Sequence, residues 1–365
     1  MSMTVFGRWV RRVLDDPQVL LLLLLLAGTF GLLNFFARPL APVIAAVVLA
    51  FLLDRPTELL RRRGWPNWAA STVVFTGFLA LVVLGALVIL PPVVKQFEQF
   101  LALVPDMVAR LRSAALGLPD SFPGLVSPEF VQDFFEGIGR ALTSGGQALL
   151  DTVLSSVRGA VTLAVYLILI LLMLFFFIKD KRAILGWLAS FLPQERPLLD
   201  AVYCEVVEGA GNYARGKFYE ILIVGVAAWL TYLLLDLRFA VLLALITGLS
   251  VVIPYVGATV VTFPVAMVAF FQWGIGPEFF AVLIAYLILQ AIDGNLLAPL
   301  LMSEVVRLHP NAVILSILIF GHLWGVWGVF FAIPLAVLIH AVIEAWRCHN
   351  DPACDMATAV DGAPD

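Results

Sequence analysis

Charged residues are scarce in this chain. Asp, Glu, Lys and Arg together make up 13% of its 365 residues, about half of the roughly 25% found in soluble globular domains. Hydrophobic residues reach 62%, and apolar runs of about twenty residues recur along the chain, as in helices that cross a lipid bilayer. This composition argues against a soluble enzyme. The sequence predicts an all-α polytopic membrane protein with the bilayer as its main partner.

Cysteine and histidine are few, with three and four residues, and an excess of positive charge is absent. The three cysteines, Cys204, Cys348 and Cys354, have no CxxC spacing and no histidines at ligand intervals, so neither a disulfide framework nor a zinc site is indicated. The formal net charge is -4, without the basic patch that nucleic acid requires. We therefore predict no metal, no cofactor and no nucleic-acid partner.

The apolar runs predict about eight membrane segments. The first five runs are residues 18–36, 39–53, 68–90, 157–178 and 218–235. The later runs are residues 239–253, 255–272, 279–298, 311–320 and 328–345. Several of these are broken by Gly or Pro and are too short to cross alone, which is typical of the arms of a re-entrant or broken helical hairpin. We expect two such hairpins.

Lysine and arginine set the predicted orientation. Basic residues gather before the first span, in a polar hinge at residues 54–67 and in residues 179–217, so these three regions are expected on the cytoplasmic side. Residues 91–156, with four basic residues against seven acidic ones, are then external. Both termini are predicted to be cytoplasmic.

The same reasoning divides the chain into five parts. They are residues 1–90 with the first three spans, 91–156 outside, 157–217 with the fourth span and a cytoplasmic connection, 218–350 as the core, and 351–365 as a disordered tail. In the external part, apolar residues recur at helical spacing between positions 93 and 111 and between 131 and 142. We expect two amphipathic helices there, which lie on the membrane or pack on neighbouring subunits. The alternative is a gate at the outer mouth.

The core contains a span followed by a hairpin twice, in opposite senses. Residues 218–235 lead outward to a hairpin with its tip at 253–257, and residues 279–298 lead inward to one with its tip at 321–328. Inverted repeats of this kind are typical of transporters that hold substrate at the midplane, where two broken elements meet. We therefore predict a substrate site between the hairpins, and its tip residues are Pro254, Tyr255, Gly257, Gly325 and Gly328.

Few ionisable residues fall at membrane depth in the core, and each is costly there unless it faces a cavity or a partner. Asp293 is the leading candidate. With Gln290 and Asn295 it would contact a substrate or a proton near the inner end of its span, where Pro299 is expected to break the helix. The alternative is that Asp293 is only an interfacial residue that ends the helix.

Three charged residues mark the expected cytoplasmic mouth. Lys217 and Glu220 are three residues apart on one predicted helix and can be partners. Arg215 is expected to be an interfacial anchor. His309 and Pro310 should begin the first arm of the second hairpin.

Several motifs resemble the autoinducer-2 exporter family of permeases. They are YARG at 213–216, IPYVG at 253–257, DGN at 293–295 with Pro299, LHP at 308–310, and GVWGV at 325–329 followed by IPL at 333–335. The resemblance implies a homo-oligomeric transporter of about eight membrane segments, whose members are linked to export of a small quorum-sensing furanone or to sodium(lithium)/proton antiport. The sequence departs from the usual family pattern at Lys217, commonly glutamine, and at Asp293, more often glutamate.

Export of a small polar metabolite, with autoinducer-2 as the candidate, is the function we predict. Sodium(lithium)/proton antiport is the alternative. Antiporters need carboxylates that exchange a proton for a metal ion, and Asp293 and Glu220 are few for this task. An intramembrane enzyme is disfavoured because Ser250 and His322 stand in no GxSxG or HExxH motif. A scaffold without transport would have no need of broken hairpins.

Overall fold

The computed structural model describes residues 17–115, 137, 160–194, 196–254, 256–302 and 309–349, and this part of the chain forms helices and turns without any strand. Four of its helical stretches are long and apolar enough to cross a membrane: Asn67–Met107, Pro197–Leu234, Val256–Trp273 and Pro277–Leu301. The all-α prediction is confirmed for these residues. Tyr255, the tail at 351–365 and, apart from Gly137, the second external helix lie outside the described residues.

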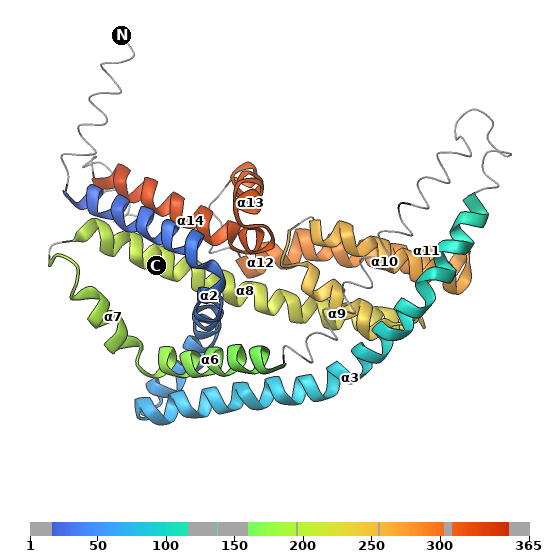
Figure 1. The fold of residues 1–365 in the computed structure, drawn as a ribbon, viewed down its shortest axis with the longest axis horizontal. Coiled ribbons are helices and arrows are strands. Elements are labelled where there is room, and N and C mark those ends of the chain that lie inside the picture. Colours follow the sequence, from blue (N-terminus) through green and yellow to red (C-terminus); the bar gives the residue numbers. More distant parts are fainter. Residues whose placement is uncertain are drawn as a thin grey trace, which may run out of the picture. The chain divides into compact units, whose positions relative to one another are not determined.

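The chain forms two compact units. The first comprises Met1–Phe75, Leu169–Glu220 and Gly294–Asp365, and the second comprises Thr76–Ile168 and Ile221–Asp293. Figure 1 labels the helices. The two hairpins of the core therefore belong to different units, the first hairpin to the second unit and the second hairpin to the first.

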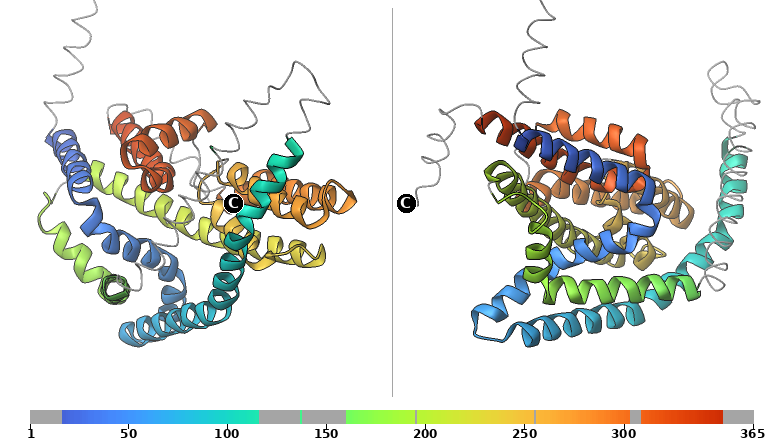
Figure 2. Two further views of the ribbon diagram at one scale, coloured as in Figure 1. Left: turned by 45° about the vertical axis from the view of Figure 1, so that its right-hand side comes forward. Right: turned by 60° about the vertical axis from the view of Figure 1, so that its left-hand side comes forward.

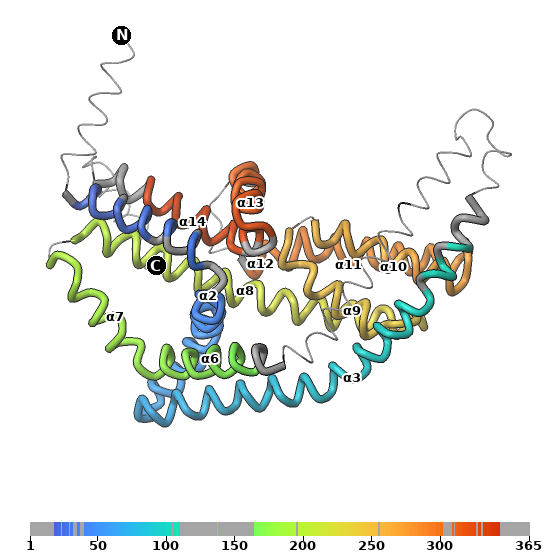
Figure 3. The backbone as a smooth tube through the Cα atoms, viewed as in Figure 1, coloured from blue at the N-terminus to red at the C-terminus, as the bar shows by residue number. Residues whose placement is uncertain are grey.

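Helix α2 (Pro17–Arg62) opens the first unit and combines the first two predicted spans. Helical geometry is interrupted at Phe36 (φ -117°, ψ 19°), where two helices meet, and the tube in Figure 3 changes direction along α2. The predicted polar hinge is wrong in part, because the helix continues to Arg62. Its last turns hold Glu58 within 4 Å of Arg61 and Arg62, pairs that favour helix at spacings of three and four. Gly64, with φ +87°, lies in the turn that follows.

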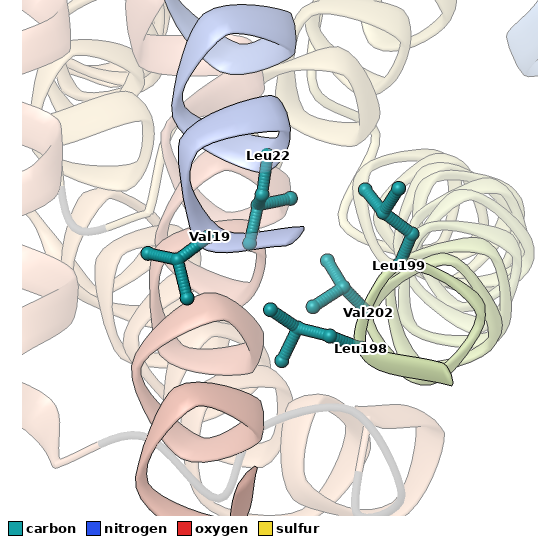
Figure 4. Packing of buried hydrophobic residues seen from close by; sticks show 5 residues of the cluster. All are labelled: Val19, Leu22, Leu198, Leu199 and Val202. Atoms are coloured by element: carbon teal, nitrogen blue, oxygen red, sulfur yellow. The ribbon is translucent and has the colours of Figure 1, made fainter. Parts of the chain in front are cut away.

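The start of α2 packs against the start of α8 (Pro197–Leu234). Val19 and Leu22 contact Leu198, Leu199 and Val202, and all five side chains are buried, as Figure 4 shows. Side chains of α14 (Val326–His349) join the edge of this cluster, and in Figure 2 α2 lies beside α14. Because it packs on α2, α8 begins well before residue 218, the predicted start of the fifth span.

The polar hinge and the connection after the fourth span lie against each other in the first unit. Lys181 Nζ is 2.9 Å from Asp54 Oδ2, Arg61 donates to the carbonyl oxygen of Ile178 over 3.0 Å, and Asn67 donates to that of Lys179 over 2.9 Å. Helix α6 (Ala160–Lys179) ends at this cluster, and α7 (Lys181–Ala189) follows it. Two of the regions predicted to share one side of the membrane thus meet.

Helix α3 (Asn67–Ala115) runs past the predicted end of the third span. Pro91, Pro92 and Pro105 lie inside it, so no helix end lies at residue 91. Proline removes its own N–H donor, yet long apolar helices tolerate this loss when the freed carbonyls are satisfied locally. The helix expected between positions 93 and 111 is therefore a continuation of α3.

Three helices of the second unit follow one another in space as in sequence. Helix α10 (Val256–Trp273) packs against α9 (Ala240–Ser250) on one side and α11 (Pro277–Ile292) on the other (Figure 1). Before α9, the chain turns through Asp236 and Phe239, both with positive φ. Gln272 holds this turn by donating to the carbonyl oxygen of Asp236 over 2.7 Å. Helix α11 begins with Gly276 and Pro277, a favoured start.

Two expected helix breaks differ from the structure. Helix α11 continues through a π-helical turn, η1 (Asp293–Leu297), into α12 (Ala298–Met302), so Pro299 does not end it. Proline fits here because it stands in the first turn of α12, next to a turn whose hydrogen bonds are already shifted. Helix α13 (Pro310–Trp324) and α14 are separated by Gly325 alone, not by the eight-residue tip expected.

Candidate functional site

Each hairpin has one glycine pressed against the backbone of the opposite arm. A Cβ atom on Gly257 would lie 1.8 Å from the carbonyl oxygen of Ser250, and one on Gly328 would lie 1.7 Å from that of Phe320. Both glycines are buried. No side chain can occupy either position while the arms keep this distance. The hairpins of the two units thus use the same contact, close to each tip.

The remaining tip residues have other roles. Gly325 adopts φ 61° and ψ -136°, a backbone conformation open to glycine almost alone, and a Cβ there would meet nothing within 4 Å. It is needed for the turn and not for packing. The carbonyl oxygen of Pro254 accepts a hydrogen bond from the N–H of Val256 over 2.7 Å and tightens the first tip.

Helix α11 carries a polar face inside its apolar sequence. Tyr286, Gln290 and Asp293 are spaced four and three residues apart, so they share one side of the helix. Tyr286 is fully buried and its hydroxyl donates to the carbonyl oxygen of Ala258 in α10 over 2.6 Å. The Gln290 amide nitrogen is buried as well. Asp293 is 8% exposed. A carboxylate, an amide and a phenol therefore line one buried face of a candidate span.

Asp293 stands where α11 changes into the π-helical turn. Asp293 is buried, whereas Gly294, Asn295 and Pro299 are exposed. Of the predicted group, the structure brings Gln290 and Asp293 to the buried face and leaves Asn295 and Pro299 off it. Single π-turns within helices are frequent at functional sites, because they redirect side chains.

Sequence reasoning missed Tyr286 and a second buried polar pair. The hydroxyl groups of Tyr232 in α8 and Thr247 in α9 lie 3.0 Å apart, and both side chains are fully buried. Next to this pair, Gly225 and Gly248 bring the two helices into backbone contact, where a Cβ on Gly248 would be 2.9 Å from the Gly225 Cα. The sequence signal that could have identified these residues is a polar residue within an apolar run, one helical turn from another small or polar residue.

The three residues predicted at the cytoplasmic mouth lie on α8 in the first unit. The Lys217 ammonium is 2.8 Å from Glu220 Oε2, and the two side chains are 8% and 3% exposed, so the predicted partnership is confirmed. Arg215 points elsewhere, donating to the carbonyl oxygen of Phe51 over 3.2 Å and to the side chain of Asn212. Of these three residues, only Lys217 and Glu220 form a buried pair.

Tyr213 lies one turn before this pair and was not predicted as a site residue. It is buried against Ile333 and Val337 of α14, and the Glu220 carboxylate acts on it electrostatically. Gly209, one turn earlier, faces α14 too, since a Cβ there would be 2.9 Å from Val337 Cγ1. The face of α8 that packs on α14 therefore continues along the helix to the ion pair.

The second unit also contains a cavity of about 140 Å³. Its polar lining comes from Asp106, Arg238 and Gln272, with Phe239 and Phe271 among the apolar residues. Its lining includes none of the predicted site residues that the structure describes. Within the described ranges, no three His, Cys, Asp or Glu side chains gather in a way that could hold a metal ion. The substrate site expected between the two hairpins stays a prediction.

Comparison with known proteins gives consistent matches over nearly the whole chain. The profile of a family described as "AI-2E family transporter" matches residues 20–348. The chain is 44% identical over 339 residues to the "Putative permease PerM" of Escherichia coli K12, covering 93% of this chain and 96% of that protein. It is 30% identical over 349 residues to the "Putative transport protein MT0215" of Mycobacterium tuberculosis, covering 93% and 91%. It is 25% identical over 312 residues to the "Putative transport protein YueF" of Bacillus subtilis, covering 84% and 82%.

Proposed function

Because this chain belongs to the AI-2E transporter family and is a membrane transporter, we propose that it exports a small, uncharged polar metabolite, with autoinducer-2 as the first candidate. The substrate is proposed to contact the polar face of α11, formed by Tyr286, Gln290 and Asp293. The two hairpin tips are proposed to gate access to it. Transport is proposed to run from the cytoplasm outward.

The observation that carries this proposal is the burial of Asp293 within the candidate span Pro277–Leu301. A carboxylate at membrane depth costs several kcal/mol unless a polar partner or cavity receives it, and such residues usually mark a substrate or ion path. Its neighbours on the same face supply further hydrogen-bonding groups: the Gln290 amide and the Tyr286 phenol. A hydroxylated, uncharged metabolite fits these groups, because its hydroxyls can donate to the carboxylate and accept from the amide.

The finer membrane arrangement is part of the proposal. We propose about eight membrane segments in the bacterial inner membrane, with both termini cytoplasmic and the second unit's hairpin and the first unit's hairpin entering from opposite sides. Large apolar side chains such as Leu84, Leu87 and Val88 are exposed along α3. We propose that such faces contact lipid or neighbouring copies in a homo-oligomer.

Efflux from proteoliposomes tests this function. Purified protein is reconstituted, the vesicles are loaded with autoinducer-2, and its release is measured for the wild type, for Asp293→Asn and for protein-free vesicles. Wild-type vesicles should release the compound fastest. Asp293→Asn should slow release at least about tenfold, because a hydrogen bond to a charged group contributes about 1.5–3 kcal/mol.

The matched control is Glu278→Gln. Glu278 lies in the first turn of the same helix and is exposed, so it loses the same charge without touching the polar face. It should release autoinducer-2 at the wild-type rate. Release no faster from wild-type than from protein-free vesicles would contradict the export proposal, whereas equal release by the wild type and Asp293→Asn would contradict only the role of Asp293.

A further inference from the structure

The cavity of the second unit lies at the base of the first hairpin, where α3 packs on it. The Gln96 side chain accepts a hydrogen bond over 2.9 Å from a backbone N–H at the start of α9, and the Phe100 ring meets that of Phe239 edge to face. Leu103 and Met107 continue the same face of α3 and line the cavity. The cavity therefore lies between α3 and the hairpin base, about one helical turn beyond this contact.

The turn before α9 holds a positive charge at the cavity. The Gln272 side chain accepts a hydrogen bond from the N–H of Arg238 over 2.8 Å and donates one to the carbonyl oxygen of Asp236 over 2.7 Å. The Arg238 guanidinium lies 5.7 Å from the centre of the Phe239 ring, a distance at which a cation and an aromatic face attract each other. Arg238 is thus positioned through both its backbone and its side chain.

Opposite charges and an apolar floor line this cavity. Arg238 and Asp106 are exposed, whereas Phe239, Met107 and Val268 are buried. The ion pairs found among the described residues include neither Asp106 nor Arg238. One carboxylate beside a guanidinium does not suit a metal cation, which prefers several oxygen ligands. The lining instead suits a small group that carries one negative and one positive charge.

The cavity lies where two candidate membrane spans end. The apolar stretch Pro197–Leu234 ends four residues before Arg238, and Val256–Trp273 ends one residue after Gln272. Leu234 itself is 85% exposed, as expected of a side chain in contact with lipid. The ends of spans lie at the level of the lipid headgroups. A headgroup is therefore the charged group most readily available to this cavity.

A phosphoethanolamine group matches the charges and the size of the cavity. A guanidinium binds phosphate oxygens with paired hydrogen bonds, and a carboxylate accepts hydrogen bonds from a primary ammonium. The two carbons that separate phosphate from ammonium suit the rings of Phe239 and Phe271. The volume of about 140 Å³ is below the roughly 300–1,000 Å³ of pockets for drug-sized ligands. One headgroup fits here, and a larger ligand does not.

We propose that this cavity binds the phosphoethanolamine headgroup of a lipid, with the phosphate on Arg238 and the ammonium on Asp106. The bound headgroup links α3 to the base of the first hairpin. A phosphocholine headgroup has no N–H to donate to Asp106, and a phosphoglycerol headgroup has no positive charge, so both bind more weakly. The site does not depend on which metabolite the protein exports.

Equilibrium binding to the purified full-length protein in dodecyl maltoside tests the site without any transport. The probes are lysophosphatidylethanolamine, lysophosphatidylcholine, lysophosphatidylglycerol and O-phosphoethanolamine, and native mass spectrometry measures the bound fraction in each titration. Lysophosphatidylethanolamine should bind about tenfold or more tightly than lysophosphatidylcholine, because only its ammonium donates a hydrogen bond to a charged group. It should also bind more tightly than O-phosphoethanolamine, since its acyl chain adds apolar contact. Equal binding of these two would overturn the lipid as the source of the headgroup.

Two substitutions separate the roles of the charges. Asp106→Asn should remove the preference for the ethanolamine over the choline lysolipid. Arg238→Gln should weaken the binding of all three lysolipids about tenfold or more, because each carries a phosphate. Arg238→Gln keeps the backbone N–H that Gln272 binds, so the turn should stay intact.

Glu98→Gln and Lys95→Gln are the matched controls. Both residues are exposed on α3 and do not line the cavity, so each variant loses the same charge away from the site. Both should bind every probe as the wild type does. Wild-type protein that does not distinguish ethanolamine from choline overturns the proposal whether or not the variants fold. An Asp106→Asn protein that keeps the preference overturns it as well.

Discussion

Tyr286 joins α11 to α10 through its hydroxyl group. Its hydroxyl donates to the carbonyl oxygen of Ala258 over 2.6 Å, and the hydroxyl of Thr262 donates to the same oxygen over 2.9 Å. The carbonyl is therefore still satisfied if the phenol is lost. Side-chain hydrogen bonds between membrane helices contribute about 0.6 kcal/mol on average.

Tyr286→Phe is expected to lower the free energy of unfolding by about 0.5–1.5 kcal/mol. The hydroxyl is lost, but the fully buried ring keeps its packing. Unfolding in mixed micelles with increasing dodecyl sulfate measures the change. Tyr219→Phe is the matched control, since Tyr219 is 50% exposed, and it should leave stability unchanged. Equal losses in both variants would show that the interhelical bond has no specific effect.

Sequence reasoning reached part of the candidate site. Asp293 was identified because a lone carboxylate in an apolar span is costly. Lys217 and Glu220 were identified because their spacing places them on one helix face. Asn295 is different: its side chain is exposed because the π-turn at 293–297 rotates it away from Asp293. A π-turn adds a residue to one helical turn and leaves little trace in composition. Tyr286 was missed because tyrosine is common in apolar helices and its partner is a backbone oxygen.

At the scale of helices, close backbone contact at Gly257 and Gly328 determines how the hairpins close. The nearest atoms to a methyl group added at either glycine would be the carbonyl oxygens of Ser250 and Phe320, at 1.8 and 1.7 Å. Backbone atoms cannot move aside as the end of a flexible side chain can. The arms would have to separate along their length.

Gly257→Ala and Gly328→Ala are each expected to cost about 1–3 kcal/mol of unfolding free energy, the usual range for overpacking. Dodecyl sulfate titration measures the loss. Gly77→Ala in α3 is the control, because a Cβ there meets nothing within 4 Å, and alanine favours helix by about 1 kcal/mol. The prediction is wrong if the hairpin variants are as stable as Gly77→Ala.

Helix positions were more predictable than helix ends. Hydrophobic runs located α6, α9, α10, α11, α13 and α14 within a few residues, because an apolar stretch in lipid has to satisfy its backbone internally. We expected helix ends before Pro91 and at the start of the polar hinge. In the structure, α3 continues past Pro91 to Ala115, and α2 continues through the hinge to Arg62. Proline and charge disfavour helix only locally, and neighbouring turns and tertiary contacts outweigh them.

At the scale of the whole molecule, the orientation rests on where basic segments meet. The hinge at residues 54–67 and the start of the connection at 179–181 contact each other through Lys181 and Asp54, and through Arg61 and Ile178. This contact is consistent with the prediction that both lie on one side of the membrane. Lysine and arginine favour the cytoplasmic side for this pair.

Labelling of Cys204 checks the orientation. This cysteine is free and exposed on α8, within the predicted cytoplasmic connection and before the ion pair. With Cys348 and Cys354 replaced by serine, a membrane-impermeant maleimide should label it in inside-out vesicles and leave it unlabelled in intact spheroplasts. A Glu98→Cys variant without the native cysteines should behave in the opposite way, because Glu98 is exposed in the region predicted to be external. The opposite labelling pattern would show that the predicted orientation is wrong.

The ion pair on α8 also bears on the response to membrane voltage. Moving one elementary charge across the full membrane potential involves about 2.3 kcal/mol per 100 mV. Lys217 and Glu220 carry opposite charges 2.8 Å apart, so a displacement of this helix segment transfers no net charge from the pair. Lys217→Gln would leave the Glu220 charge uncompensated. Wild-type flux should thus gain no voltage dependence from this segment, and flux through the Lys217→Gln variant should acquire one.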